Sequence, residues 1–316
     1  MPGRSTRPVC PSLEVLSLRV TALAIDHAVD YRYRIWAPTG GRTMTQLQTN
    51  ESYLIDSDAE MVRLDRQAAI YGSRDDLEHL ALDAEEHVLD AGCGSGQVTR
   101  TIATAIPRGK VTGIDRQPRY IDYARRRANL DGIRNVAFAE GNLLELPFES
   151  DSFDVVWSKH VLQWISEPAS ALTEFVRVTR PGGRVIAANF DGFMLQHYPV
   201  DQRVQTDLER WFDAAKSAMG FDNWIGRKLP SLFLAAGLTD VRIHTIPDKA
   251  FSGLGGDPER LWNMEVQWNA VHEFSVKVFG SEQAANEAQQ RFLARFSDPT
   301  VYFHCTMFYV EGRVPA

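Results

Sequence analysis

The stretch His87–Arg100 reads HVLDAGCGSGQVTR, and it decides the fold. It begins with an apolar run that ends in Asp90, continues through three alternating glycines and ends in residues able to open a helix. A glycine-rich turn between a strand and a helix is typical of nucleotide-binding α/β sheets, where the turn lets the backbone approach a ligand. The stretch therefore predicts a ligand site, and its details restrict the ligand.

The glycine spacing differs from that of two common phosphate-binding loops. The dinucleotide fingerprint G-x-G-x-x-G fits Gly92 and Gly94, but Gln97 stands at the third glycine and Gly96 comes one residue early. A P-loop needs a lysine followed by serine or threonine, and the stretch has none. The carboxylate of Asp90, two residues before the first glycine, disfavours a phosphate and suits a cationic ligand such as an amine or a sulfonium.

Strands and helices are expected to alternate from this loop to residue 190. Such alternation, with short apolar strands, predicts a parallel sheet with helices on both faces. Ligands of these sheets bind at the carboxyl ends of the strands. The expected strands are at 88–89, 110–115, 136–142, 153–158 and 184–190.

After residue 190 the pattern becomes mostly helical. Apolar residues recur at helical spacing over 201–220 and again over 257–280. A helix that ends at Gly237 precedes a sixth strand, and a further helix and an aromatic-rich strand finish the chain. These helical insertions stand where a lid over an active site would be built.

Two polar side chains follow the second and third expected strands. Asp115 ends VTGID, 25 residues after Asp90, where a carboxylate can accept hydrogen bonds from both ribose hydroxyls. Asn142 follows the third strand, where its amide oxygen can accept from an adenine amino group. Both positions indicate an adenosyl ligand without separating one adenosyl cofactor from another.

Five segments of the sequence, in their order and their spacing, resemble the class I S-adenosylmethionine-dependent methyltransferases. They are similar above all to the branch of the ubiquinone and menaquinone C-methyltransferases and many natural-product methyltransferases. The resemblance covers roughly residues 86–190 and is weak elsewhere. The pieces are VLDAGCGSG, VTGID, AEGNLLELPF, SFDVVWSKHVLQWI and LTEFVRVTRPGGRVIAANF.

The resemblance implies a Rossmann-like α/β fold, a seven-stranded, mostly parallel sheet whose last strand is antiparallel, with S-adenosyl-L-methionine as cofactor. Asp115 would hold the ribose hydroxyls, with Arg116 beside the adenine. At the adenine position the family commonly has aspartate, from which Asn142 departs. The remaining implied cofactor contacts are Asp90, Gly92, Cys93 and Gly94 at the methionine and ribose, Ser158 and Lys159 at the methionine end, and Leu143.

Methyl transfer from a sulfonium is an in-line displacement, so the enzyme contributes mainly alignment and exclusion of water. A base that removes a proton from a hydroxyl, a thiol or an acidic carbon often adds about 10²–10⁴-fold in rate. His160 follows the fourth expected strand and is the first candidate base, and His197 follows the fifth and is the second. For each histidine, an ordinary packing or surface role is the alternative.

The substrate is expected between the lid elements and the strand ends. Several large aromatic residues in the lid predict a flat or lipophilic small molecule. Other aromatic residues of these segments are expected to belong to the core. The candidate pocket residues are Tyr53, Gln67, Tyr198, Trp211 and Trp268.

The first 43 residues carry six arginines against three acids and no lysine. We interpret them as a disordered extension or as residues before a true start at Met44, and an organellar transit peptide is the alternative. Residues 44–316 then form one methyltransferase domain, with lid elements at about 50–72, 191–236 and 256–298.

The composition of the chain restricts the classes of partner that it is expected to bind. The net charge of −7 argues against a general nucleic-acid binder. The three cysteines lie far apart without metal-ligand spacing, which predicts no metal site and a reducing cytoplasm. No apolar run approaches the roughly 20 residues of a membrane span. The sequence defines neither an oligomeric state nor the atom that accepts the methyl group.

The chain is thus expected to be a cytoplasmic enzyme that methylates a small organic acceptor in secondary or quinone-like metabolism. Three alternatives stay open. In the first, the chain methylates a protein or an RNA. In the second, it is a nicotinamide-dependent oxidoreductase. In the third, it binds the cofactor without catalysing a reaction.

Overall fold

The computed structural model describes residues 58–71 and 73–316. The N-terminal 43 residues, Tyr53 and the first part of the 50–72 lid element lie outside the described residues. The strands are β1 (His87–Ala91), β2 (Lys110–Asp115), β3 (Val136–Glu140), β4 (Phe153–Lys159), β5 (Thr179–Tyr198), β6 (Thr239–Pro247), β7 (Gly253–Leu254) and β8 (Tyr302–Arg313).

Helices connect the strands. The helices before and between the first strands are α1 (Asp58–Tyr71), α2 (Ser73–Leu80), α3 (Gln97–Ala105), α4 (Pro118–Leu130) and α5 (Pro168–Val178). The later helices are α6 (Gln202–Met219), α7 (Leu229–Ala235), α8 (Pro258–Ala270), α9 (His272–Phe279) and α10 (Glu282–Ser297). Two short 3₁₀ helices are η1 (Leu162–Trp164) and η2 (Gly226–Lys228).

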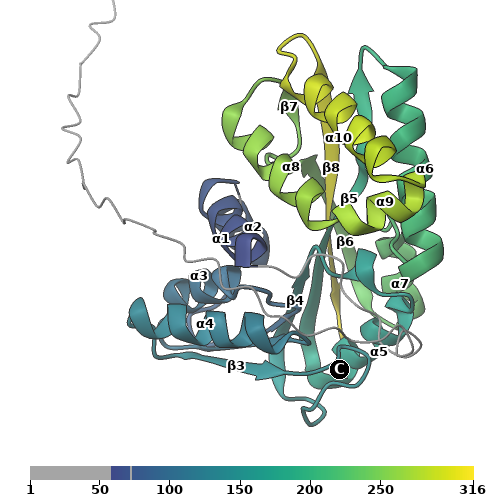
Figure 1. The fold of residues 1–316 in the computed structure, drawn as a ribbon. Coiled ribbons are helices and arrows are strands. Elements are labelled where there is room, and N and C mark those ends of the chain that lie inside the picture. The colour runs from purple at the N-terminus through teal and green to yellow at the C-terminus, as the bar shows by residue number, and fades with distance from the viewer. Residues whose placement is uncertain (1–57, 72) are drawn as a thin grey trace, which may run out of the picture. The chain divides into compact units, whose positions relative to one another are not determined.

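The strands form one sheet in the order β3-β2-β1-β4-β5-β8-β6, and β7 pairs with β8 (Figure 1). Strands β1 to β5 pair in parallel, whereas β8 runs antiparallel between β5 and β6. The expected seven-stranded, mostly parallel sheet with an antiparallel last strand is confirmed, and the two-residue β7 adds an eighth strand. Strand β6 runs in the same direction as β4, so both end at the same edge of the sheet.

Both faces of the central strands β1 and β4 are buried because their successive residues are mostly apolar. Val88 packs with Ile102 of α3 on one face, and Leu89 packs with Phe175 of α5 on the other. Helix α7 covers the same face as α5, and its Phe233 is fully buried there. The helices therefore lie on both sides of the sheet, and the carboxyl ends of the strands are left for a ligand site.

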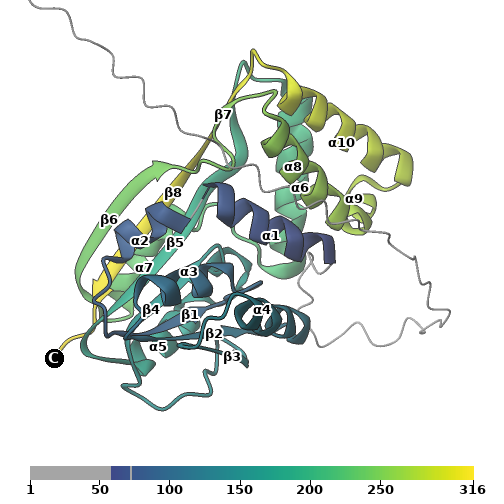
Figure 2. The ribbon, with the colours of Figure 1, turned by 90° about the vertical axis from the view of Figure 1, so that its left-hand side faces the viewer.

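The outer parts of β5 and β8 stay paired with each other beyond the ends of β4 and β6 and carry a second apolar core. We call α6, α8, α9 and α10 the helical cap, and Figure 2 shows them grouped around these strand ends. Trp211 of α6, Met264 of α8 and Phe292 of α10 pack in this core. The apolar stripe over 257–280 is divided between α8 and α9, which join at Val271. Among the described helices, none combines the length and the apolar character needed to cross a membrane.

Candidate active site

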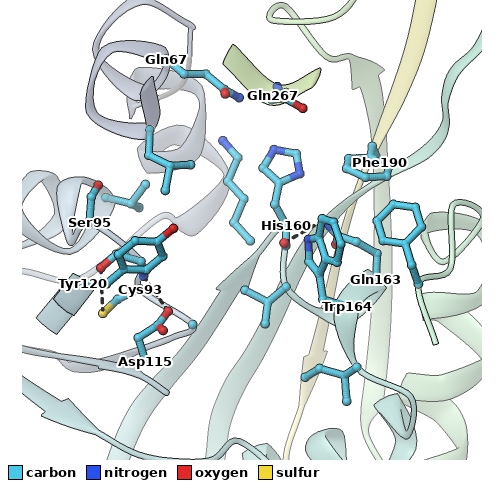
Figure 3. A pocket seen from close by; sticks show the side chains of 18 of the residues that line it. Gln67, Cys93, Ser95, Asp115, Tyr120, His160, Gln163, Trp164, Phe190 and Gln267 are labelled. Atoms are coloured by element: carbon cyan, nitrogen blue, oxygen red, sulfur yellow. Dashed lines mark hydrogen bonds between the residues drawn. The ribbon is translucent and has the colours of Figure 1, made fainter. Parts of the chain in front are cut away.

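A cavity of about 310 Å³ lies at the carboxyl ends of the strands. Its lining comes from the glycine loop, from the ends of β2, β3 and β4, from α1 and from the helical cap. Figure 3 shows Asp115 and Tyr120 toward one end, Gln67 and Gln267 toward another, and the His160 ring between them. We call the part beside the glycine loop the loop end and the part beside the helical cap the cap end.

The glycine loop is held by the end of β2. The backbone N–H groups of Gly92 and Cys93 both donate to the carbonyl of Ile114, at 2.8 and 2.9 Å. The Asp115 carboxylate accepts from the N–H of Gly94 at 3.0 Å and from the N–H of Gln117 at 3.0 Å. These bonds place the carboxylate beside the loop.

Two acids at the loop end are buried and have raised pKa values. Burial raises the pKa of Asp90 to about 7, although the Thr99 hydroxyl donates to it at 2.6 Å. Burial also raises the pKa of Asp115, and the backbone hydrogen bonds that it accepts oppose the shift. A cationic ligand would stabilise the ionised form of both carboxylates, so this end of the cavity fits a ligand with a positive charge.

A lysine and a histidine follow each other at the end of β4. The Lys159 ammonium donates to both oxygens of Asp76 at 2.8 Å, and the Tyr309 hydroxyl donates to the same carboxylate at 2.9 Å. His160 has a left-handed backbone with a φ of 56°. Its pKa is held well below the ordinary value by burial and by the charges of Lys159 and Arg63. The imidazole is therefore neutral at physiological pH.

Aromatic rings wall the cap end of the cavity. Trp211 and Trp268 have ring centroids 6.4 Å apart, and the indole N–H of Trp211 donates to Ser275 at 3.0 Å. The wall gives this end an apolar surface suited to a flat molecule. Its aromatic residues are Trp164, Phe190, Phe193, Trp211, Phe212, Phe221, Phe251 and Trp268.

Helix α1 is linked to α8 of the helical cap. Arg66 forms an ion pair with Glu259, and its guanidinium lies 4.3 Å from the ring centroid of Trp262. Arg63 lines the cavity and donates to Asn263 at 2.7 Å. Since α1 also contacts α3 beside the glycine loop, it joins the two sides of the cavity.

The family model for the methyltransferase domain matches residues 82–237. The sheet order and the glycine loop agree with this match. Residues 82–237 are a class I S-adenosylmethionine-dependent methyltransferase domain. The cofactor of this family is S-adenosyl-L-methionine.

Relatives of the methyltransferase domain are found among curated proteins and solved structures. An uncharacterized methyltransferase of Schizosaccharomyces pombe is 31% identical over 166 residues, which cover 51% of this chain and 59% of that protein. A demethylmenaquinone methyltransferase of Geobacillus stearothermophilus is 28% identical over 185 residues, 54% of this chain and 78% of that protein. The chain spans about half the length of the first curated relatives that it matches.

A solved structure of phosphoethanolamine N-methyltransferase 2 from Haemonchus contortus, in complex with S-adenosyl-L-methionine, shares the fold. Its TM-score is 0.54 at 16% identity, and the match covers 82% of this chain and 58% of that one. At this identity the likeness shows a shared fold.

Most of the predicted cofactor residues lie together in the cavity lining. Ser158 does not, because it is fully buried and its hydroxyl donates to the carbonyl of Ala91 at 3.0 Å. The Asn142 amide oxygen accepts from the Leu144 N–H at 3.0 Å and keeps a second lone pair. The predicted cofactor residues in the lining are Asp90, Gly92, Cys93, Gly94, Asp115, Arg116, Asn142, Leu143 and Lys159.

The predicted residues of the acceptor side are only partly brought together. His160, Gln67, Trp211 and Trp268 line the cavity, whereas His197 and Tyr198 are not part of its lining. His197 is 7% exposed and has its ring 5.7 Å from that of Phe303, and Tyr198 is 73% exposed. The placement of these two in the site is corrected because β5 runs on to residue 198 and carries both away from the sheet edge.

Several cavity residues were missed by the sequence reasoning. Asp248 lines the cavity and follows β6 directly. The sequence feature that could have identified it is its position, as an acidic residue at the carboxyl end of an expected strand. Gln163 and Gln267 line it from helices, and no local pattern marks them. Over the described parts of the chain, the structure brings together no group of three or more side chains able to hold a metal ion.

Proposed function

We propose that this chain transfers the methyl group of S-adenosyl-L-methionine to a small, flat, lipophilic acceptor. The observation that carries the proposal is the continuity of one cavity, from the acidic glycine loop to an aromatic chamber. The name of the demethylmenaquinone methyltransferase relative supports a quinone-like acceptor.

The residues of the loop end fit the cofactor. We assign Asp115 to the ribose and Asn142 to the adenine. The buried carboxylate of Asp90 favours the positively charged methionine end. When bound, the cofactor supplies a methyl group on a sulfonium, which is attacked in line. The loop amides are held by Ile114, so they need little reorganisation on binding.

The residues of the cap end would bind and align the acceptor. The aromatic wall orients a planar ring system and excludes water, which favours a near-attack geometry. We assign α1 and the helical cap as lid elements, because Arg66 and Arg63 link them above the cavity. His160, which stands between the two ends in Figure 3, is the candidate base.

Calorimetric titration with S-adenosylhomocysteine tests the proposal. Saturable binding with one site per chain is expected, and subsequent addition of planar hydroxylated aromatics should give binding to the aromatic chamber. A protein that binds NADH and does not bind S-adenosylhomocysteine would refute the proposal in favour of an oxidoreductase. Trp268→Ala enlarges the chamber and should weaken aromatic binding while the affinity for S-adenosylhomocysteine stays unchanged.

A further inference from the structure

Asp248, which was not among the predicted site residues, lies beside His160. Asp248 follows β6 and His160 follows β4, and these strands end at the same edge of the sheet. The Asp248 Oδ2 atom is 3.7 Å from His160 Nε2. Both side chains line the cavity, between the glycine loop and the aromatic wall.

Asp248 is held rigidly in this position. Its backbone N–H donates to the carbonyl of Cys305 at 2.8 Å, and its Oδ1 atom accepts from the N–H of Ala250 at 2.9 Å. These bonds leave Oδ2 directed at the imidazole. The carboxylate is 8% exposed, so solvent screens it little.

His160 is also constrained. Its left-handed φ of 56° is uncommon for a residue with a Cβ atom, and such strain is concentrated at functional sites. Its backbone N–H donates to Ala188 at 2.9 Å, and Gln163 donates to its carbonyl at 2.7 Å. The Nδ1 atom is buried and has no hydrogen-bond partner among the described residues, whereas Nε2 faces Asp248.

We propose that Asp248 and His160 act as a proton-accepting pair and that the methyl acceptor therefore carries a phenol-like or enol-like hydroxyl. This inference rests on the proposed methyltransferase function. A hydroxyl of this kind has a pKa near 10 and is mostly protonated at neutral pH, so it gains most from a base. A neutral amine can attack with its own lone pair and lose its proton afterwards.

The hydroxyl oxygen bonds to the methyl carbon while the methyl–sulfur bond breaks, and the sulfur keeps that electron pair. The hydroxyl proton goes to Nδ1 of His160, which a rotation of the imidazole in the substrate complex would expose to the cavity, and Asp248 accepts a hydrogen bond from Nε2–H and stabilises the imidazolium. The separation of 3.7 Å would shorten in the substrate complex, as catalytic hydrogen bonds commonly do.

The surrounding charges set the resting protonation. Lys159 on β4 and Arg63 on α1 face the imidazole, Asp76 of α2 partly neutralises Lys159, and the Phe190 ring lies 5.5 Å from the imidazole. Burial raises the pKa of Asp248 to about 6, and burial with the two cations keeps the pKa of His160 low. At neutral pH the acid is then ionised and the imidazole is neutral, as the step requires.

Nuclear magnetic resonance of protein labelled with ¹⁵N-histidine tests the pair without turnover. The His160 ring nitrogens, identified by loss of the signal in His160→Gln, should report a protonation step near pH 6 as Asp248 titrates. Asp248→Asn should abolish the step and Asp248→Glu should restore part of it. Asp213→Asn, which removes an exposed carboxylate of α6, is the control that should leave it in place. Ring-nitrogen shifts that are the same in wild type and Asp248→Asn would overturn the pairing.

Methyl transfer to 2-naphthol and to the more acidic 1-nitro-2-naphthol tests the acceptor class. Asp248→Asn should lower kcat with 2-naphthol by about 10–100-fold and with the nitro compound by much less, because the latter ionises without help. An equal loss with both acceptors would mean that Asp248 has only a structural role. Transfer to 2-naphthylamine and to neither naphthol would overturn the hydroxyl assignment. Failure to bind S-adenosylhomocysteine would defeat the proposed function, while the resonance titration of the ligand-free protein would still decide the pairing.

Discussion

Replacing Gly96 with alanine tests how tightly the glycine loop is packed against the sheet. Gly96 is the last loop residue before α3, and its φ is 70°. An added Cβ would lie 2.6 Å from the Ala124 Cβ of α4 and 2.7 Å from the ring of Phe138 on β3. Both neighbours are buried, so neither can move aside easily. Gly132 is a matched control, because its φ is 69° and an added Cβ would meet no atom within 4 Å.

The two substitutions share the backbone strain and differ in the clash. Left-handed backbone costs a non-glycine residue about 1–2 kcal/mol, and overpacking a rigid core adds about 1–3 kcal/mol. We therefore expect Gly132→Ala to lower the free energy of unfolding by about 1–2 kcal/mol, and Gly96→Ala by about 2–5 kcal/mol.

Urea unfolding followed by circular dichroism measures this difference. The midpoint should shift at an unchanged slope, since the area exposed on unfolding stays the same. In thermal unfolding, each kcal/mol corresponds to about 2–4 °C for a domain of this size. Equal losses in the two variants would refute the reasoning, because the clash that distinguishes the sites would then contribute nothing.

Three further substitutions probe the site. Asp115→Ala should weaken S-adenosylhomocysteine binding in calorimetry by at least about 100-fold, because it would remove the two charge-assisted hydrogen bonds proposed to the ribose, and unchanged affinity would contradict the ribose assignment. Because burial raises the pKa of Asp90 from 3.8 to about 7, the wild-type free energy of unfolding should fall as the pH rises between these values. Asp90→Asn should flatten this dependence in unfolding titrations, with a gain above pH 7 of at most roughly 4 kcal/mol, and an unchanged slope would show that Asp90 does not titrate in this range. Arg66→Ala should cost less than about 1 kcal/mol, since the ion pair with Glu259 is partly exposed, yet it should speed amide hydrogen exchange in α1, and unaltered exchange would contradict the proposed link.

The loop end of the cavity could be predicted because its chemistry is local to strand ends. Asp90 precedes the glycines on β1, Asp115 ends β2 and Asn142 follows β3, and neighbouring parallel strands bring such positions to one edge. The exception is Ser158, whose side chain hydrogen-bonds to the adjacent strand β1. Which side of its strand a residue faces depends on the register of pairing, and a motif does not encode that register.

The error at His197 has a different physical origin. The sequence predicts a strand over 184–190 and a mostly helical pattern after residue 190. The structure has left-handed residues at Gly192 and Met194, yet pairing with β8 resumes at Gln196 after the irregularity. The partner strand β8 continues alongside and supplies the hydrogen bonds, so tertiary pairing overrides the local signal.

The acceptor side of the site depends on contacts between segments that are far apart in the chain. Gln67 comes from α1, His160 follows β4, Asp248 follows β6 and Trp268 belongs to α8. His160 and Asp248 meet only because β8 inserts antiparallel between β5 and β6, which returns the end of β6 to the edge where β4 ends. A motif search sees each of these residues alone, as an ordinary acid, amide or aromatic. The alternating strands and helices thus predict the parallel sheet, whereas the shape of the proposed acceptor chamber depends on how the helical cap packs against that sheet.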